Sequence, residues 1–245
     1  MLFRSVYGFA MNMSTDNATC IEYFTAFAWN SGGSILNDKG GPFLLGNEIF
    51  TKTVNFYKSL FDNSVVAPGM FTMTDADKVQ EFVNRRVAFM PDSVAHLTNI
   101  LEQAPNLNMT YMNMPHIDDY NGTNYMRANN WAVGVAVNSE HPAEAAQFIA
   151  YLLEPEVNAD LCVHAGGFPV NTKAQPVYTN TSTAFTAILD IYENTIGKSE
   201  FYSLPTAEAL MKILDEDLIL YIEGEYESAE AMLTHVQAAF DAAYQ

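Results

Sequence analysis

The sequence predicts an α/β fold with additional helices, and three observations lead to that prediction. Short apolar segments alternate with stretches of helical periodicity over the first half of the chain. Helical periodicity then dominates the second half. Nearly half of the 245 residues are hydrophobic and 13% are aromatic, so the chain can bury a substantial core. Strands that alternate with helices are typical of α/β proteins.

Five short apolar runs predict strands, at residues 3–10, 35–36, 87–90, 109–114 and 131–137. Helices are expected over residues 17–29 and 93–103, and two further helices follow capping residues. Asn47 is the expected cap of one, and Thr74 with Asp77 resembles a capping box at the start of the other. Asn121–Gly122 predicts a tight turn within residues 116–125.

The second half is expected to be mostly helical. Pro142 suits the first position of a helix that runs to about Leu153, and Pro155 suits the start of another that ends at Gly166–Gly167. Residues 168–170 are expected to be extended. The remaining helices are predicted near residues 181–195, 206–222 and 226–243.

The charge of the chain excludes two classes of partner. With 29 acidic and 11 basic residues, the formal net charge is −18, which disfavours binding to nucleic acid and to anionic membrane surfaces. No apolar run reaches the roughly 18 residues that a bilayer-spanning helix needs. The first residues also lack the apolar segment and cleavage site of a signal peptide. Taken alone, these residues indicate a cytoplasmic protein.

Motifs for catalysis, metals and cofactors are largely absent, so we expect neither a cofactor nor a metal. Gly197–Lys198–Ser199 is similar to the end of a phosphate-binding loop, but Tyr192 stands where that motif needs glycine. Cys20 and Cys162 are expected to be buried thiols. The candidate carboxylate pairs of a glycosidase are expected to form a solvated helix face; they are Asp215, Glu216 and Asp217, and Glu223 with Glu225.

Several segments resemble family 1 extracellular solute-binding proteins, the group that includes maltose-binding protein. The first three are FAWNSGGSILNDKG, FYKSLFDNSVVAPG and EFVNRRVAFMPDS. The fourth and most extended is VAVNSEHPAEAAQFIAYLLEPEVNADLCVHAGGFPVN, and the C-terminal helices are also similar. The segments occur in the family's order over almost the whole chain. The resemblance therefore implies a periplasmic-binding-protein-like fold of two α/β lobes, with solute bound between them and closure by a hinge.

The resemblance also implies how the chain is divided. Residues 1–128 and 202–245 would form a nearly complete C-terminal lobe, and residues 129–201 would form the hinge crossing and part of the N-terminal lobe. About the first third of the family's chain has no counterpart here, so we expect an N-terminally truncated protein. In that case the helix at 142–153 would lack the sheet it normally covers, and Phe148, Ile149 and Leu152 would be unusually exposed.

Ligand-binding residues are carried over from the resemblance position by position. They lie in the loop after the first strand, at the end of the first helix, after the strand at 87–90, before the strand at 131–137, and in the loop after Gly166. These residues are Asn12, Trp29, Asp92, Ser93, Asn129, Asn130, Trp131, Gly166, Gly167 and Phe168. Core packing is the alternative for Trp29, Trp131 and Phe168. The family's aromatic residue after Ser93 is missing, which disfavours a maltose-like ligand.

The function implied by the resemblance is binding of a small extracellular solute and its delivery to the permease of an ABC transporter, without catalysis. Aromatic and Asn side chains near the expected cleft favour a neutral sugar or polyol. The implied location is the periplasm, or the cell surface for a lipoprotein. Two alternatives remain open. A carbohydrate-active enzyme would need two carboxylates on opposite walls of one cleft. A non-catalytic interaction domain would show a large exposed apolar patch and no cleft.

Overall fold

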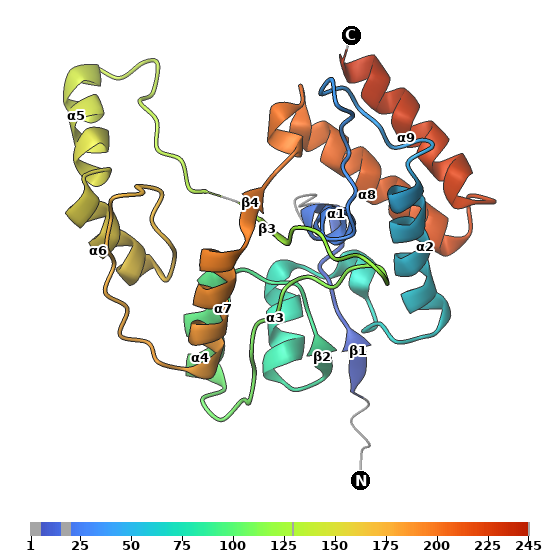
Figure 1. The fold of residues 1–245 in the computed structure, drawn as a ribbon, viewed down its shortest axis with the longest axis horizontal. Helices are drawn as coiled ribbons and strands as arrows, with labels where there is room; N and C mark the ends of the chain where they lie inside the picture. The colour runs from blue at the N-terminus through green and yellow to red at the C-terminus, as the bar shows by residue number, and fades with distance from the viewer. Residues whose placement is uncertain (1–5, 16–20, 129, 245) are drawn as a thin grey trace. The chain divides into compact units, whose positions relative to one another are not determined.

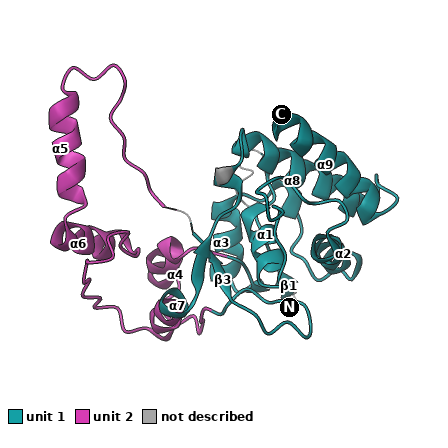
Figure 2. Cartoon of the chain, turned by 45° about the horizontal axis from the view of Figure 1, so that its top comes forward, with its two compact units in different colours: residues 1–91, 112–128, 191–245 teal, residues 92–111, 129–190 magenta. Residues whose placement is uncertain are grey.

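The computed structural model describes residues 6–15, 21–128 and 130–244 (Figure 1). Cys20 and Asn129 lie outside these described residues, as does the expected start of the first helix. The chain divides into two compact units, which Figure 2 shows in different colours. Unit 1 consists of residues 1–91, 112–128 and 191–245, and unit 2 consists of residues 92–111 and 129–190.

Unit 1 contains two pairs of short parallel strands. Strand β1 (Tyr7–Phe9) pairs with β2 (Val87–Phe89), and Phe9 also bridges to Val66. Strand β3 (Tyr125–Arg127) pairs with β4 (Ile196–Lys198). The strand β4 was not predicted, because its three residues are too few to show an alternating pattern.

Among its described residues unit 1 contains five helices, and side chains from all of them except the helix at residues 75–83 form the main core. The helices are α1 (Ile21–Trp29), α2 (Glu48–Asp62), α3 (Asp75–Val83), α8 (Ala207–Glu223) and α9 (Ala229–Tyr244), with short 3-10 turns at η2 (Met70–Thr72) and η4 (Phe201–Ser203). Every residue of α1 is buried. Around it lie Phe50 and Tyr57 of α2, Leu214 and Leu218 of α8, and Phe240 of α9. Aromatic edge contacts join Phe24 to Phe50 at a centroid distance of 6.0 Å.

The predicted helix caps are confirmed. The side chain of Asn47 accepts a hydrogen bond from the backbone N–H of Phe50, at 3.3 Å. Thr74 and Asp77 form a reciprocal capping box, in which each side chain accepts from the backbone N–H of the other residue. These interactions satisfy N–H groups that the first turn of a helix leaves without partners.

Unit 2 is built mainly from helices around a small core. Its elements are η3 (Val94–His96), α4 (Leu97–Gln103), α5 (Pro142–Leu152), α6 (Pro155–Ala165) and most of α7 (Thr183–Asn194). Leu97, Ala184 and Phe185 form the buried centre of this core. Helix α5 buries none of its residues, and Phe148 is 58% exposed. The prediction that α5 leaves its apolar face uncovered is therefore confirmed.

Three sequence predictions are wrong. Residues 131–137 and 109–114 form no strand, because neither segment finds a neighbouring backbone to pair with among the described residues. Asp215 and Asp217 are buried, whereas Glu216, Glu223 and Glu225 are exposed, so the expected solvated face is wrong for Asp215 and Asp217 only. Asp217 is buried because it accepts hydrogen bonds from the hydroxyl of Tyr226 and pairs with Nδ1 of His235 at 3.0 Å.

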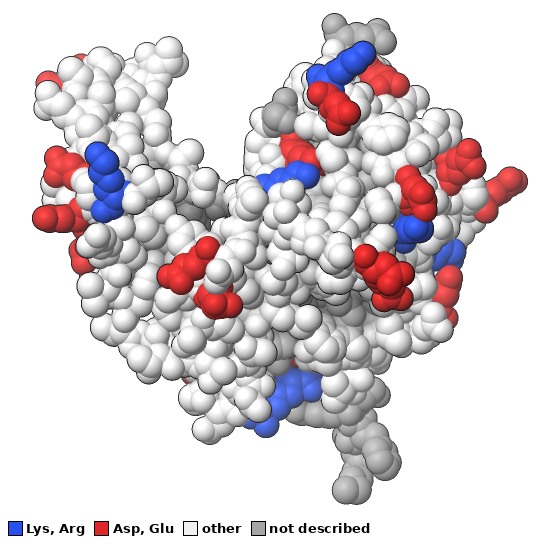
Figure 3. Space-filling model, in the orientation of Figure 1, with Lys and Arg blue, Asp and Glu red and all other residues white. Residues whose placement is uncertain are grey.

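Charged groups on the surface match the composition. Figure 3 shows acidic side chains spread over one face of the molecule, several of them beside a basic side chain. Two ion pairs on α2, Lys52–Glu48 and Lys58–Asp62, each join residues four positions apart. Within the part of the chain that the structure describes, no helix is both long and apolar enough to span a bilayer. Cys162 is a free, half-buried thiol, and burial raises its pKa.

Candidate functional site

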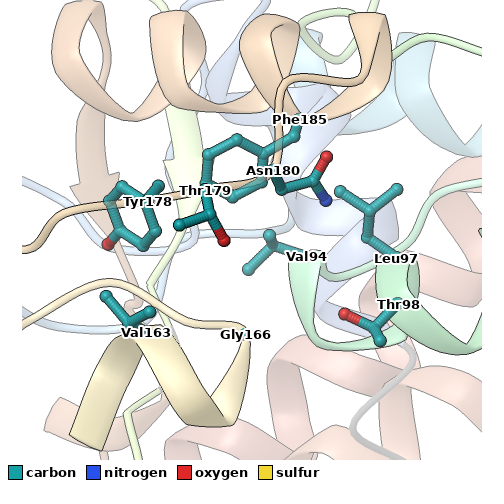
Figure 4. Close-up of a pocket in the computed structure, with 9 residues that line it drawn as sticks. All are labelled: Val94, Leu97, Thr98, Val163, Gly166, Tyr178, Thr179, Asn180 and Phe185. Atoms are coloured by element: carbon teal, nitrogen blue, oxygen red, sulfur yellow. The ribbon is translucent and has the colours of Figure 1, made fainter. Parts of the chain in front are cut away.

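Unit 2 contains a cavity of about 70 Å³ between α4, the end of α6 and the start of α7 (Figure 4). Its walls come from four separate segments of the chain. The lining residues are Val94, Leu97, Thr98, Val163, Gly166, Tyr178, Thr179, Asn180 and Phe185. Figure 4 shows Tyr178, Thr179, Asn180 and Phe185 on one side, facing Val94, Leu97 and Thr98. Gly166, one of the residues predicted to bind ligand, forms part of this wall.

The end of helix α6 shapes one wall. Gly166 is its C-cap and adopts the left-handed conformation, with φ of 67°. The N–H of Gly167 donates to the carbonyl oxygen of Cys162 at 2.9 Å, which satisfies a helix-end carbonyl. A β-carbon at Gly166 would lie 3.7 Å from Oγ1 of Thr98. That distance is an ordinary van der Waals contact, so the left-handed turn, and not the approach to α4, is what favours glycine here.

Aromatic rings hold the loop after α6 in place. The hydroxyl of Tyr178 donates to the carbonyl oxygen of Gly167 at 3.0 Å. The Tyr178 ring packs edge-on against Phe168, at a centroid distance of 6.0 Å and an angle of 81°. It also contacts the ring of Phe185 at 4.9 Å. Gly167 and Phe168, both predicted site residues, thus support the wall of the cavity through Tyr178.

The loop before α4 brings two further predicted site residues to this unit. The side chain of Ser93 accepts a hydrogen bond from the N–H of Ala95 and caps η3. The carbonyl oxygen of Ser93 accepts from the hydroxyl of Tyr111 at 3.2 Å. Asp92 pairs with His96 through an Oδ1–Nδ1 distance of 2.8 Å. Asp92 and Ser93 therefore position the turn that carries Val94 into the cavity wall.

None of the described residues that line the cavity carries a charged side chain. Its polar groups are the hydroxyls of Thr98, Thr179 and Tyr178 and the amide of Asn180, set among apolar and aromatic residues. Such groups donate and accept hydrogen bonds without favouring an ion of either sign. The arrangement suits a neutral ligand that carries both hydroxyl groups and apolar faces.

Two of the predicted site residues outside the cavity are open to solvent. Trp131 is 96% exposed, and Asn130 before it is also exposed. The core alternative for Trp131 is therefore wrong in this structure. Asn129 lies outside the described residues.

The other two predicted site residues are buried in unit 1. Trp29 has no exposed surface, and its indole N–H donates to Glu200 at 2.7 Å. The structure thus places Trp29 in the core, which was the alternative to ligand contact. Asn12 is 5% exposed, and within the described part of the chain its Oδ1 has no hydrogen-bond partner. That oxygen is a buried acceptor that a ligand hydroxyl could satisfy.

Sequence reasoning missed Thr98, Tyr178 and Asn180. One signal for Asn180 was present: its side-chain oxygen accepts from the N–H of Ser182 at 3.0 Å and so marks the start of α7. Thr98 and Tyr178 lie 80 positions apart in the sequence, and nothing local shows that they share a cavity.

A family model described as a bacterial extracellular solute-binding protein matches residues 6–187 of the chain. The chain belongs to this family. A curated relative, a binding protein of Brucella abortus (strain 2308), is 27% identical over 187 residues, which is 75% of this chain and 44% of that protein. The same figures hold for a binding protein of Brucella suis biovar 1 (strain 1330). The chain thus spans less than half the length of these curated relatives.

Solved structures of solute-binding proteins share the fold. One is an ABC transporter solute-binding protein from Agrobacterium radiobacter K84 in complex with ribitol, with a TM-score of 0.74 at 18% identity. The match covers 97% of this chain and 59% of that protein's chain. A solute-binding protein of Thermotoga lettingae TMO, bound with α-D-tagatose, has a TM-score of 0.74 at 15% identity, with 98% and 60% covered. A maltose-bound T. maritima protein has a TM-score of 0.73 at 14% identity, with 97% and 60% covered.

These findings confirm the predicted family and the periplasmic-binding-protein-like α/β fold. The division of that fold into lobes stays a prediction. The compact units describe which residues cluster within this chain, and residues 92–111 cluster with 129–190. The roles of the ten predicted site residues also stay predictions.

Proposed function

We propose that this solute-binding protein takes up a neutral sugar or polyol and delivers it to the permease of an ABC importer. The observation that carries the proposal is the uncharged cavity lining, in which hydroxyl and amide groups lie among aromatic and aliphatic side chains. A sugar offers the complementary surface, with hydroxyl groups at its edge and C–H groups on its faces. The strongly negative net charge of −18 also disfavours an anionic solute.

Solved solute-binding proteins of the same fold support this ligand class. The Agrobacterium, Thermotoga lettingae and T. maritima proteins were solved with ribitol, α-D-tagatose and maltose, respectively. Two of these ligands are small and all three are uncharged. The proposal extends their shared chemistry to this chain without choosing among them.

The cavity is proposed as one part of the solute site. Its volume of about 70 Å³ is well below the roughly 300 Å³ at which typical ligand pockets begin. Trp131 is proposed to complete the site by stacking on a sugar face, because its ring is almost fully exposed. Asn130 would supply hydrogen bonds to hydroxyl groups, as Asn side chains offer both a donor and an acceptor.

The proposed role is binding and transfer, without chemical conversion of the solute. Members of this family are extracellular, so the protein is proposed to act in the periplasm or at the cell surface as a lipoprotein. Its partners would be the solute and the membrane permease. No role with nucleic acid is proposed, because the negative charge would repel a phosphate backbone.

Thermal-shift measurements test the proposed function directly. The chain is heated with increasing ribitol, D-tagatose or maltose, and in parallel with inorganic sulfate and a sugar phosphate. A ligand that binds only the native state raises the melting temperature as its concentration rises. We expect at least one neutral compound to do so and the anions to have no effect. Stabilisation by a phosphate or sulfate ester, with no response to any sugar or polyol, would overturn the proposal.

A further inference from the structure

Strands β3 and β4 adjoin two of the places where the chain passes between its compact units. The chain leaves unit 1 after Ala128, directly beyond β3, and returns at Ile191, shortly before β4. Both strands belong to unit 1 and pair in parallel, with Arg127 opposite Lys198. The chain also crosses between the units after Pro91 and after Tyr111, so these two segments are two of its four connections.

Glu22 links both strands at the first turn of α1. Its Oε2 accepts a hydrogen bond from Nε of Arg127 at 2.6 Å, and its Oε1 accepts from the hydroxyl of Ser199 at 2.8 Å. Glu22 has no exposed surface. Burial by itself lowers the pKa of Arg127, but attraction to Glu22 and nearby tyrosines outweighs this and raises the pKa. The guanidinium therefore stays charged beside its carboxylate partner.

Glu200 makes the equivalent link at the other end of α1. Its Oε2 accepts from the indole N–H of Trp29 at 2.7 Å and from the backbone N–H of Ile35 at 2.9 Å. Its Oε1 accepts from the hydroxyl of Ser34 at 2.6 Å and pairs with Nζ of Lys198 at 2.8 Å. Glu200 is 7% exposed. One buried carboxylate thus joins β4 to the end of α1 and to the chain that follows it.

Asn30 holds the backbone of β3 in the same region. Its Nδ2 donates to the carbonyl oxygen of Tyr125 at 2.8 Å, and its Oδ1 accepts from the N–H of Tyr125 at 3.0 Å. The side-chain amide therefore pairs with both backbone groups of one residue, as a neighbouring strand would. The ammonium of Lys198 lies 4.9 Å from the centroid of the Tyr125 ring and 5.5 Å from that of Trp29. The strands β3 and β4 are thus joined to α1 at both ends of that helix.

We propose that Glu22 and Glu200 form a clamp that holds both crossing strands to helix α1 and thereby sets how tightly the protein binds its solute. The inference rests on the proposed function, because a clamp at the crossings affects affinity only if binding requires the units to move. Buried charges with several partners occupy one arrangement, since any displacement leaves a desolvated group unpaired. When β3 and β4 are held against α1, only the segments beyond these strands can change conformation. The solute-free protein then samples fewer conformations.

The test replaces each carboxylate by the amide of the same shape. Glu22→Gln and Glu200→Gln remove the charge, and Ser199→Ala and Ser34→Ala remove a single hydrogen bond from each carboxylate, in case the first pair folds poorly. Glu48→Gln is the control, because Glu48 is exposed and pairs only across one turn of α2 with Lys52. Amide hydrogen exchange is followed by mass spectrometry in peptides that cover residues 124–128 and 195–200.

The expected result is local. Exchange in these two peptides should become about tenfold faster in the Glu22 and Glu200 variants, with smaller increases for the serine variants and none for Glu48→Gln. Affinity for whichever of ribitol, D-tagatose or maltose the wild type binds should fall by about fivefold or more. Unchanged exchange in the two peptides would overturn the clamp. So would exchange that rises equally in α8 and α9, because that pattern indicates general loss of stability.

The two proposals can fail separately. The exchange measurement needs no solute, so it decides whether Glu22 and Glu200 hold the strands even if the wild type binds none of the three compounds. That absence of binding would overturn the proposed function. Local loosening combined with unchanged solute affinity would overturn the second half of the inference, namely that the clamp sets affinity.

Discussion

The two tryptophans show what sequence reasoning about single residues can and cannot provide. Trp29 and Trp131 both stand beside asparagine and small residues, and both were predicted to contact ligand. Trp29 is buried because it donates to Glu200, which lies 171 positions away. Trp131 is exposed because residues 131–137 are exposed and, within the described part of the chain, nothing covers them. The composition shows that the chain has aromatic residues that could bind a ligand. Contacts with residues far away in the sequence determine which of the two tryptophans is buried in the core.

Trp131→Ala should lower the affinity for solute without lowering the stability of the solute-free chain. The ring is 96% exposed, so its removal should leave the melting temperature of the solute-free chain unchanged. A stacking contact of about 1 kcal/mol corresponds to roughly a fivefold loss of sugar affinity. Melting curves with and without solute measure both effects.

Trp29→Phe provides the contrast for that measurement. It removes the N–H that Glu200 accepts and leaves space in the core, so the unfolding free energy should fall by about 2 kcal/mol or more. A large drop in the melting temperature of Trp131→Ala, comparable with that of Trp29→Phe, would contradict the stacking role.

Gly166→Ala tests the turn that ends α6. A β-carbon at φ of 67° is strained, so the variant should lose about 1 kcal/mol of stability. Gly134→Ala is a matched control, because a β-carbon there would meet no atom within 4 Å. Urea unfolding of the two variants measures the difference, and equal midpoints would show that the left-handed turn is not needed.

At the scale of elements, helices were predicted better than strands. The helices α2, α3, α5 and α6 begin within a residue of the expected positions, because capping side chains and prolines act within one turn of the chain. Strands depend on partners that are remote in sequence. Residues 131–137 have an apolar run but no partner, whereas β4 has a partner in β3 and almost no pattern.

The capping box of α3 supports a prediction about that helix. Thr74→Ala removes the acceptor for the N–H of Asp77, and caps of this type contribute about 1 kcal/mol. The urea midpoint should fall accordingly. Thr110→Ala is the control, since Thr110 is exposed and lies outside every helix. A Thr74 variant as stable as this control would show that the box contributes nothing in solution.

The contact between α8, α9 and the loop joining them predicts a response to alkaline pH. Burial and the hydrogen bond to Asp217 raise the pKa of Tyr226 to about 12 from its ordinary value of 10. Because the folded-state pKa is the higher one, the stabilisation is fully present below pH 10 and is lost as the pH rises towards 12.

Melting temperatures of the wild type and Tyr226→Phe should therefore differ at neutral pH and converge across this interval. The variant lacks the phenol that titrates, so its own curve should be flatter between pH 10 and 12. A constant difference across the interval would mean that the Tyr226–Asp217 contact does not depend on the protonation of the phenol.

At the scale of the whole molecule, the sequence was sufficient for the family and the fold class but not for the cavity. Ordered resemblances along the chain predicted a solute-binding protein, and the family match over residues 6–187 confirms it. Gly166 was predicted because it stands in a recognisable loop. Thr98, Tyr178 and Asn180 were not, because the cavity forms only when α4, α6 and α7 pack together. That these three residues line one cavity can be recognised only from the tertiary structure.

The uncovered face of α5 predicts how the whole chain behaves in solution. Phe148, Tyr151 and Leu153 are each about half exposed, and Ile149 and Leu152 are only partly covered. Contiguous apolar surface of this kind favours contact between copies of the chain.

Replacing Phe148 by serine should reduce self-association and dye binding to exposed apolar surface. It should leave the melting temperature unchanged, because the side chain supports no core. Phe24→Ser is the opposite case, since Phe24 is fully buried and its loss should unfold unit 1. Sedimentation at several concentrations measures the association, and a wild-type chain that stays monomeric throughout would contradict the prediction.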